Sequence, residues 1–442
     1  MTGQVMLALA IAALLLGLRP APAAPSARPL DLGLVWSGHP VGFCLLTEGE
    51  RQFVAFYDAR RRLTVAARRL DSRRWQLVRL PETLGWDSHN YVTMAADDEG
   101  YLHLSGNMHG APLVYFRTTR PWDITTFTRL PAMAGRNEQH CTYPVFLRGP
   151  GGRLLFTYRD GSSGNGDQYY NVYDPNTRAW RRLLDTPLTS GEGQVNAYLH
   201  GPVLGPDGYY HLCWVWRDHG GCESNHDLCY ARSRDLVHWE TSAGRPLSLP
   251  LTRSTAEVVD PVPVHGGMLN GNTVIGFDRQ GRVIISYHKF DPQGYTQLYN
   301  ARLEPGGWRL YQVTAWDYRW DFQGGGAIVT EIGVGAVRPQ ANGSLTQSYR
   351  HPRAGSGAWR LDEVTLRPLG PAPSRSLIPP ELNRAESPVP GMEVRWCSDT
   401  GRDRPPGLTY LLRWETLPAN RDQPRATAPP PTMLKLYELK AG

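Results

Sequence analysis

The sequence has few lysines, no long run of like charge and, after its N-terminus, no apolar segment long enough to cross a membrane. Without a Lys/Arg tract we expect no nucleic-acid partner. Without a long apolar run we expect no membrane partner for the mature chain. The formal net charge is +6 and comes mostly from arginine. Because arginine pairs with carboxylates through parallel hydrogen bonds, this charge balance suits an anionic partner.

Amphipathic helical periodicity is also absent, whereas glycine (46), proline (37) and tryptophan (14) are frequent. This composition is typical of many short strands joined by tight turns, with aromatic side chains packed between sheets. We therefore expect an all-β chain. Its 442 residues are compatible with one domain, since closed β architectures often reach this length.

The N-terminus carries a short apolar run, residues 6–18, followed by an arginine, prolines and small residues. The run is shorter than the roughly 20 residues of a transmembrane helix. We therefore predict a secretory signal peptide over residues 1–24 and a mature protein that is secreted or periplasmic. A single membrane anchor is the alternative interpretation.

A repeated unit runs along the rest of the chain. A turn glycine that leads into an apolar strand recurs in segments starting at Glu99, Gly151, Asp207 and Gln280. An aromatic residue then opens an outer strand in six units, at intervals of 51 to 69 residues: Trp75, Phe127, Trp180, Trp239, Trp308 and Trp359. Repeats of about 40–50 residues with four strands each are typical of propeller blades.

The repeat predicts a single seven-bladed β-propeller of four-stranded antiparallel blades over residues 25–442. Segments 409–416 and 433–439 are its predicted closing strands. The Pro/Ser-rich segment 371–390 is short, so we interpret it as a loop between strands. Two stacked β-domains are the alternative.

Polar residues at the ends of neighbouring strands are the candidate functional residues, because loops at the mouth of a propeller usually form its binding site. His89 precedes one strand and His109 follows the next, so we expect the two imidazoles side by side. Tyr143 begins the following unit and Arg159 ends its second strand. Arg217 takes the equivalent place one unit later.

Each of these residues also has a structural interpretation. A single histidine in a β-protein is more often a hydrogen-bonded structural residue than a catalyst. Tyr143 precedes a proline and is compatible with a packed aromatic. Arg159 beside Asp160, and Arg217 beside Asp218, are compatible with rim ion pairs of little energy. The joint placement of all five favours a functional site.

Two histidines, a tyrosine and two arginines meet the needs of β-elimination at a uronate. Arginine stabilises the enolate-like charge that develops when the proton beside the carboxylate is removed. Histidine or tyrosine serves as base, or as acid toward the leaving glycosidic oxygen. Hydrolysis would need two carboxylates about 5–10 Å apart. Asp87, Asp160 and Asp218 lie beside the candidate residues, and we interpret them as groups that orient His and Arg.

The motifs HN and NMH, with TYP and YRDG after them, resemble those of the seven-bladed propeller polysaccharide lyases, which include ulvan lyases and rhamnose–glucuronate lyases. The resemblance covers residues 36–299 and is strongest over 86–167. It implies cleavage of rhamnose–uronate linkages in an acidic polysaccharide by β-elimination, leaving a 4,5-unsaturated uronate, with no cofactor required. It also implies a catalytic set and a substrate-binding set: His89, His109, Tyr143 and Arg159 in the first, and Arg217, Asn90 and Asn107 in the second.

The same fold group contains rhamnosidases, whose chemistry lies on the opposite face of the propeller around an early histidine. His39, in WSGHPVGF, corresponds to that histidine in this alternative, and it is otherwise a structural residue before a proline. A non-catalytic propeller that binds acidic glycans is a third hypothesis. In each case we expect a monomer.

Six cysteines accompany the predicted export, and Cys222 and Cys229 are close enough in sequence for a loop-closing disulfide. With His219 and His226 they also have the residue types of a zinc site. A structural calcium ion is a further hypothesis from the resemblance. No catalytic metal is expected.

Overall fold

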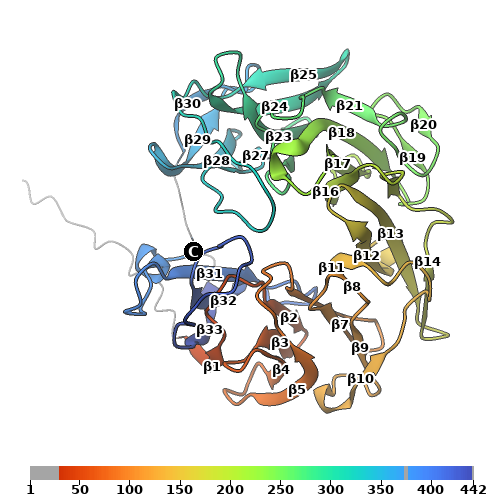
Figure 1. The fold of residues 1–442 in the computed structure, drawn as a ribbon, viewed down its shortest axis with the longest axis vertical. Coiled ribbons are helices and arrows are strands. Elements are labelled where there is room, and N and C mark those ends of the chain that lie inside the picture. Colours follow the sequence, from red (N-terminus) through yellow and green to blue (C-terminus); the bar gives the residue numbers. More distant parts are fainter. Residues whose placement is uncertain (1–28, 373–376, 441–442) are drawn as a thin grey trace, which may run out of the picture.

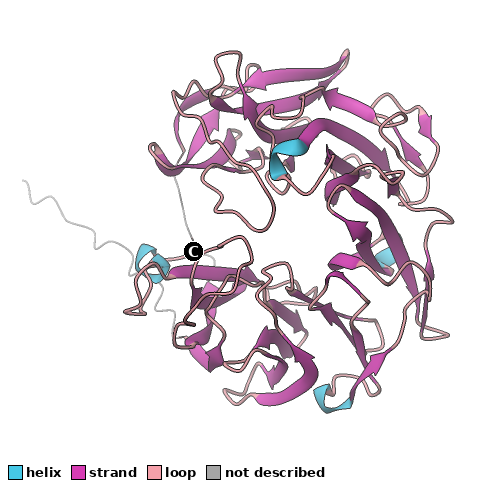
Figure 2. Cartoon of the chain, in the orientation of Figure 1, coloured by secondary structure: helices cyan, strands magenta, loops and turns pink. Residues whose placement is uncertain are grey.

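The computed structural model describes residues 29–372 and 377–440. Among these residues there is no α-helix, and strands dominate (Figure 2). The prediction of an all-β chain is confirmed. Four short 3-10 helices occur, η1 (Ile124–Thr126), η2 (Pro150–Gly152), η3 (Cys222–Ser224) and η4 (Pro380–Asn383). No helix in the described part is long and apolar enough for a membrane span, and the predicted signal peptide, 1–24, lies outside it.

The strands form seven antiparallel sheets that follow one another around a common centre (Figure 1). Four sheets have the four strands expected, ordered from the innermost strand to the outermost. They are β2 (Cys44–Glu48), β3 (Arg51–Tyr57), β4 (Arg62–Arg69), β5 (Gln76–Thr83); β6 (Val92–Ala96), β7 (Leu102–Gly106), β9 (Tyr115–Thr118), β10 (Phe127–Leu130); β22 (Val274–Phe277), β23 (Val283–Phe290), β24 (Thr296–Glu304), β25 (Gly307–Gln312); and β31 (Glu393–Ser398), β32 (Leu408–Thr416), β33 (Thr432–Lys440), β1 (Leu30–Val35).

The other three sheets carry additional short strands, so four strands per sheet is not general. One contains β11 (Cys141–Arg148), β12 (Leu154–Ser162), β13 (Asn165–Asp174) and β14 (Ala179–Arg182), with β8 (His109–Ala111) and β15 (Thr189–Ser190). The next contains β16 (Asn196–Leu204), β17 (Tyr210–Arg217), β18 (Asn225–Ser233), β19 (Trp239–Glu240), β20 (Pro246–Leu247) and β21 (Glu257–Asp260). The last contains β28 (Leu345–His351), β29 (Gly355–Leu361) and β30 (Pro368–Pro371), with β26 (Gly333–Val334) and β27 (Arg338–Pro339).

The first and last described strands share one sheet. β1 pairs antiparallel with β33, with Leu30 opposite Leu436. β32 and β33 correspond to the predicted closing strands, and the Pro/Ser-rich segment lies between β30 and β31 as expected. Because the two ends of the described chain complete one sheet, β1 gains a hydrogen-bonded partner that its neighbours in sequence do not supply.

Aromatic side chains fill the space between neighbouring sheets. Trp180, on β14, donates its indole N–H to the Tyr115 hydroxyl of the preceding sheet at 2.9 Å, and Trp308, on β25, packs edge-on against Tyr230 at 4.9 Å. Burial of such side chains contributes about 1.5–3 kcal/mol each. Trp359 differs from the prediction, because it lies on β29 and the outer strand of its sheet is β30.

The turn glycines lead into the second strand of each sheet rather than into the innermost one. Gly100, for example, adopts φ +89° in the turn that follows β6 and precedes β7. The second strand runs antiparallel to the first, so its last residues lie beside the first residues of the innermost strand. Arg159 and Arg217, near the ends of β12 and β17, therefore lie at the rim where β11 and β16 begin.

Candidate active site

Asp87 joins the two predicted histidines. Its Oδ1 accepts hydrogen bonds from the main-chain N–H of His89 at 2.8 Å and from His89 Nδ1 at 2.7 Å. Its Oδ2 accepts from His109 Nδ1 at 2.5 Å. The two imidazole rings stack with centroids 4.2 Å apart. A carboxylate that accepts from both Nδ1 atoms leaves each Nε2 available to bind or move a proton.

The electrostatics of this trio favour an ionised Asp87. Burial by itself would raise its pKa, but the hydrogen bonds from His109 and His89 outweigh burial and hold the pKa well below its usual range. The ligand atoms of the three residues also lie within 4.8 Å of one another, so they could hold a metal ion. Hydrogen bonds account for the contacts of Asp87 with both histidines. That the protein uses no catalytic metal stays a prediction.

Tyr143 reaches the histidines through a distortion of β11. The pairing of β11 with β12 shifts register between Thr142 and Val145, and Tyr143 has φ +57°. A non-glycine residue in this region costs about 1–3 kcal/mol and persists only where its surroundings hold it. Bulges of this kind redirect side chains. The Tyr143 ring lies 5.8 Å from that of His89.

Arg159 lies on the other side of Tyr143. It is 2% exposed, and its guanidinium carbon lies 5.1 Å from the centre of the Tyr143 ring. Gly166 on β13 leaves room for it, since a Cβ there would come within 2.8 Å of Arg159 Cδ. Burial, with Tyr198 nearby, raises the pKa of Tyr143 well above its usual value despite Arg159. Tyr143 is therefore a neutral hydroxyl at neutral pH.

Tyr198 is part of the site and was not identified from the sequence. Its hydroxyl accepts hydrogen bonds from Arg217 at 3.1 Å and from Arg159 at 3.5 Å, and it contacts the Ser163 hydroxyl at 2.7 Å. Tyr198 is the third residue of β16, as Tyr143 is the third residue of β11. The equivalent position in the next repeat was the signal that could have revealed it.

The two arginines have no acidic partner among the described residues. Arg159 Nε is buried without a hydrogen bond. Arg217, 7% exposed, donates to the main-chain oxygens of residues 219–221 and to Tyr198. The predicted rim ion pairs with Asp160 and Asp218 do not form, since Asp218 pairs with His226 at 2.9 Å. Buried cations are normally paired, so this pair of guanidiniums is suited to an anionic ligand.

These side chains, which we call the rim cluster, come from two neighbouring sheets and from the loop before β6: Asp87, His89, His109, Tyr143, Arg159, Tyr198 and Arg217. The cluster places proton-transfer groups on one side and two unpaired cations on the other. It can accept a proton, donate one and stabilise a developing negative charge.

We expect Tyr198 to ionise before the other tyrosines as pH is raised. Burial would raise its pKa, but Arg217 and Arg159 outweigh burial and lower it below the ordinary value of 10.0. In an alkaline titration followed by ultraviolet absorbance, one of the 21 tyrosines should contribute an early step. The Tyr198→Phe variant should lack this step, and its presence there would contradict the assignment.

The two predicted asparagines differ in placement. Asn107, at φ +59° in the turn after β7, donates its amide to Glu82 Oε2 at 2.8 Å and to the Thr83 carbonyl at 3.3 Å. The main-chain oxygen of Asn90 accepts from the Tyr57 hydroxyl at 2.6 Å. The side chain of Asn107 therefore holds the turn before His109, whereas the contact of Asn90 is made by its main chain. The substrate-binding role of both asparagines stays a prediction.

His39 does not lie on a separate face. It is 1% exposed, accepts the Trp36 indole N–H at 3.0 Å and packs on Trp86 with ring centroids 5.6 Å apart. Burial lowers its pKa against the raising effects of Asp87 and Asp422. These contacts favour the structural interpretation of His39, and its role as a substrate-binding residue stays a prediction.

The sequence leaves the segment 219–229 open between a disulfide and a zinc site. All six cysteines are free, so Cys222 and Cys229 form no disulfide. His226 is held by Asp218 and Asp227, at 2.9 Å each. Within the described ranges, the predicted zinc residues His219, Cys222, His226 and Cys229 do not gather into a group of metal ligands. A structural calcium ion stays a prediction.

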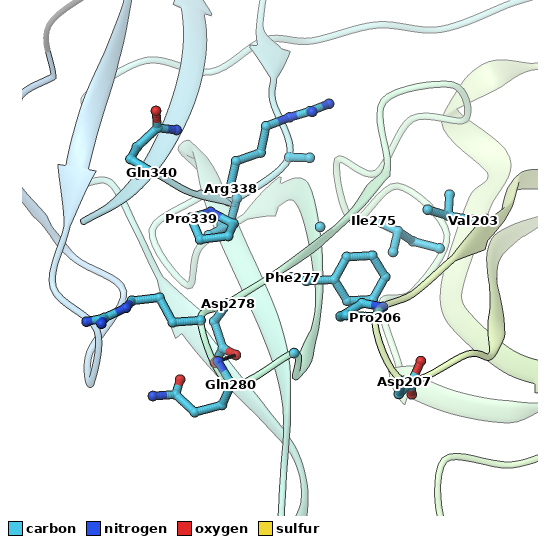
Figure 3. A pocket seen from close by; sticks show the side chains of 15 residues that line it. Val203, Pro206, Asp207, Ile275, Phe277, Asp278, Gln280, Arg338, Pro339 and Gln340 are labelled. Atoms are coloured by element: carbon cyan, nitrogen blue, oxygen red, sulfur yellow. Dashed lines mark hydrogen bonds between the residues drawn. The ribbon is translucent and has the colours of Figure 1, made fainter. Parts of the chain in front are cut away.

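A cavity of about 880 Å³ lies at the opposite ends of the strands from the rim cluster. It is lined by the end of β16 at Val203 and the end of β22 at Phe277, among others, and Figure 3 shows Phe277 beside Pro206. It includes none of the rim cluster. The cavity and the rim cluster are therefore separate features.

A ring of antiparallel sheets with a His, Tyr and Arg cluster at one rim defines a propeller-like protein with a polar rim site. The model of BNR repeat-containing family members matches residues 51–316, and the chain belongs to this family. No curated protein matches the chain.

Three solved structures have a similar fold along nearly the whole chain. An ulvan lyase of polysaccharide lyase family PL25 aligns with a TM-score of 0.62 at 14% identity, covering 93% of this chain and 96% of that one. The polysaccharide lyase Uly1 aligns with a TM-score of 0.60 at 12% identity, covering 93% and 99%. The PL25 ulvan lyase bound to -[GlcA(1-4)Rha3S]- aligns with a TM-score of 0.55 at 14% identity, covering 93% and 96%. At these identities the similarity is one of fold.

Proposed function

We propose that the protein is a polysaccharide lyase that cleaves rhamnose–glucuronate linkages of an acidic polysaccharide by β-elimination. The observation that carries the proposal is the pair of buried arginines without acidic partners, beside two histidines and a neutral tyrosine. The carboxylate of a uronate fits this pair, because guanidinium groups bind carboxylates bidentately. The ulvan and lyase names of proteins with a similar fold support the same substrate class.

The reaction begins with removal of the proton on the carbon beside the carboxylate. His89 or His109 takes this proton through Nε2, since Nδ1 of each ring donates to Asp87. The electron pair moves toward the carboxylate, where Arg159 and Arg217 stabilise the developing negative charge. Formation of the carbon–carbon double bond then expels the glycosidic oxygen.

Tyr143 is suited to protonate that leaving oxygen. Its pKa is raised by burial, so it holds its proton at neutral pH, and its ring lies near those of both histidines. Tyr198 accepts hydrogen bonds from both arginines and so links their guanidinium groups. The division of roles between His89 and His109 is decided by comparing His89→Ala with His109→Ala.

The function is tested by incubating the protein with a panel of uronate polysaccharides, including ulvan and a rhamnoglucuronan. We expect ultraviolet absorbance to rise as unsaturated uronate ends form. Free rhamnose without this rise would favour the rhamnosidase alternative. Binding without any product would favour a glycan-binding propeller, and either result would contradict the lyase proposal.

Three further properties belong to the same proposal. The seven sheets are taken as seven blades of one closed propeller, completed by the β1–β33 pairing. The chain acts outside the cell or in the periplasm after loss of residues 1–24, which suits a polymeric substrate. It acts as a monomer, since the rim cluster is formed within one chain.

A further inference from the structure

Asp422 approaches the rim cluster from a distant part of the sequence. It lies in the loop between β32 and β33, and its side chain is 13% exposed. Its Oδ1 accepts from the Ser88 main-chain N–H at 2.9 Å and from the Ser88 hydroxyl at 2.7 Å. Its Oδ2 lies 3.5 Å from His89 Nδ1. One carboxylate oxygen thus accepts both the main-chain and the side-chain hydrogen bond of Ser88.

The same carboxylate also binds the long connection 313–332 between β25 and β26, which we call the strap. Asp422 Oδ2 accepts from the Ala327 main-chain N–H at 2.7 Å, and the neighbouring Arg421 side chain donates to the Gly325 carbonyl at 3.1 Å. In Figure 1 the strap extends toward the centre of the ring. Asp422 is therefore shared between the strap and the histidine loop.

A second loop also holds the strap, close to the residues that bind Asp422 and Arg421. Glu223 Oε2 accepts from the Gly324 main-chain N–H at 2.7 Å, and Cys222 donates its main-chain N–H to the Gly324 carbonyl at 2.9 Å. Glu223 lies in the loop that follows Arg217. The strap therefore contacts both the Arg217 loop and the Asp422 loop, and of the two carboxylates that hold it, Asp422 is the one that also binds Ser88.

We infer that Asp422 is a positioning residue of the rim cluster, acting through Ser88 on the Asp87–His89 pair. The inference rests on the proposed function and adds a residue to it. Asp87 orients both imidazoles only while the loop 84–91 is held, and Ser88 is the residue between Asp87 and His89. A carboxylate that takes both hydrogen bonds of Ser88 fixes the main chain on each side of it.

The test compares Asp422→Asn, Ser88→Ala, their combination and Glu223→Ala. Asp422→Asn keeps the size of the side chain and removes the charge that Ser88, Ala327 and His89 Nδ1 share. We expect it to lower kcat about 10–100-fold, as the loss of outer partners of functional histidines does, with KM and Tm nearly unchanged. Ser88→Ala should lower kcat in the same way, and the double variant should lose less than the product of the two losses.

Glu223→Ala is the matched control, because it removes a carboxylate that holds the strap and leaves the hydrogen bonds of Ser88 untouched. We expect kcat to be retained in this variant. If Glu223→Ala lowers kcat as much as Asp422→Asn does, Asp422 acts only by holding the strap, and the inference is overturned. An unchanged kcat in Asp422→Asn would overturn it as well.

A readout without substrate separates this inference from the proposed function. In protein labelled with nitrogen-15 at histidine, the ring signals of His89 and His109 are assigned by replacing each residue in turn. They should shift in Asp422→Asn and stay in place in Glu223→Ala. If no uronate polysaccharide is cleaved, the proposed function fails while these signals still decide whether Asp422 positions His89, and unshifted signals would overturn that role.

Discussion

Replacement of Arg159 by alanine is expected to lower kcat for uronate elimination by about 10²–10³-fold, the usual cost of losing one group that stabilises a developing anion. Arg159 is 2% exposed, and its Nε has no partner among the described residues. No neighbouring cation can replace it, since Arg217 is held by the main-chain oxygens of its own loop. The loss should therefore appear in kcat and not only in KM.

The measurement is the initial rate of unsaturated product formation with Arg159→Ala and Arg159→Lys. Lysine keeps the charge but not the two-pronged geometry, so partial activity is expected from it. Arg181→Ala, an exposed arginine of the same sheet, is the matched control and should retain full activity. Full activity in Arg159→Ala would show that the arginine pair is not needed for elimination.

Replacement of Asp87 by alanine should have an effect at least as large, about 10³–10⁴-fold in kcat, as seen when a carboxylate that orients a catalytic histidine is changed. Asp87 binds Nδ1 of both His89 and His109. Its loss frees both rings to rotate and to exchange tautomers. The loss of kcat in Asp87→Ala should therefore exceed the smaller of the two losses of kcat in His89→Ala and His109→Ala.

Asp160→Ala is the comparison variant. Asp160 lies beside Arg159 but accepts a main-chain N–H, that of His140, at 3.0 Å. Loss of this bond should change activity little. If Asp160→Ala were as inactive as Asp87→Ala, two carboxylates would be essential, and hydrolysis would be favoured over elimination.

The sequence was sufficient to predict the all-β chain and the strand ends that meet at the rim. Strand periodicity and turn glycines are local, so they predict where β7, β12 and β17 begin and end. His89 and His109 were found because His89 precedes the strand β6 and His109 follows the strand β7. The additional short strands, such as β8 and β15, were missed because two or three residues carry no periodicity.

Tyr198 and Asp422 could not be read from local patterns. Tyr198 lies within a strand, so its flanking residues do not mark it, and only a comparison with Tyr143 at the equivalent repeat position could have done so. In the structure Arg159 and Arg217 converge on it from two sheets. Asp422 follows Ser88 by 334 residues. Its contact with Ser88 depends on where the loop between β32 and β33 lies in the folded chain. The enclosure of His39 by the indoles of Trp36 and Trp86 is likewise a property of packing.

The mass of the products tests elimination most directly. An oligosaccharide of defined length is digested, and the masses of the two fragments are added. Elimination consumes no water, so the sum should equal the mass of the intact oligosaccharide, with the unsaturation on the fragment that carries the uronate at its new end. A sum larger by one water molecule would contradict elimination and would make the rim cluster the site of a hydrolase.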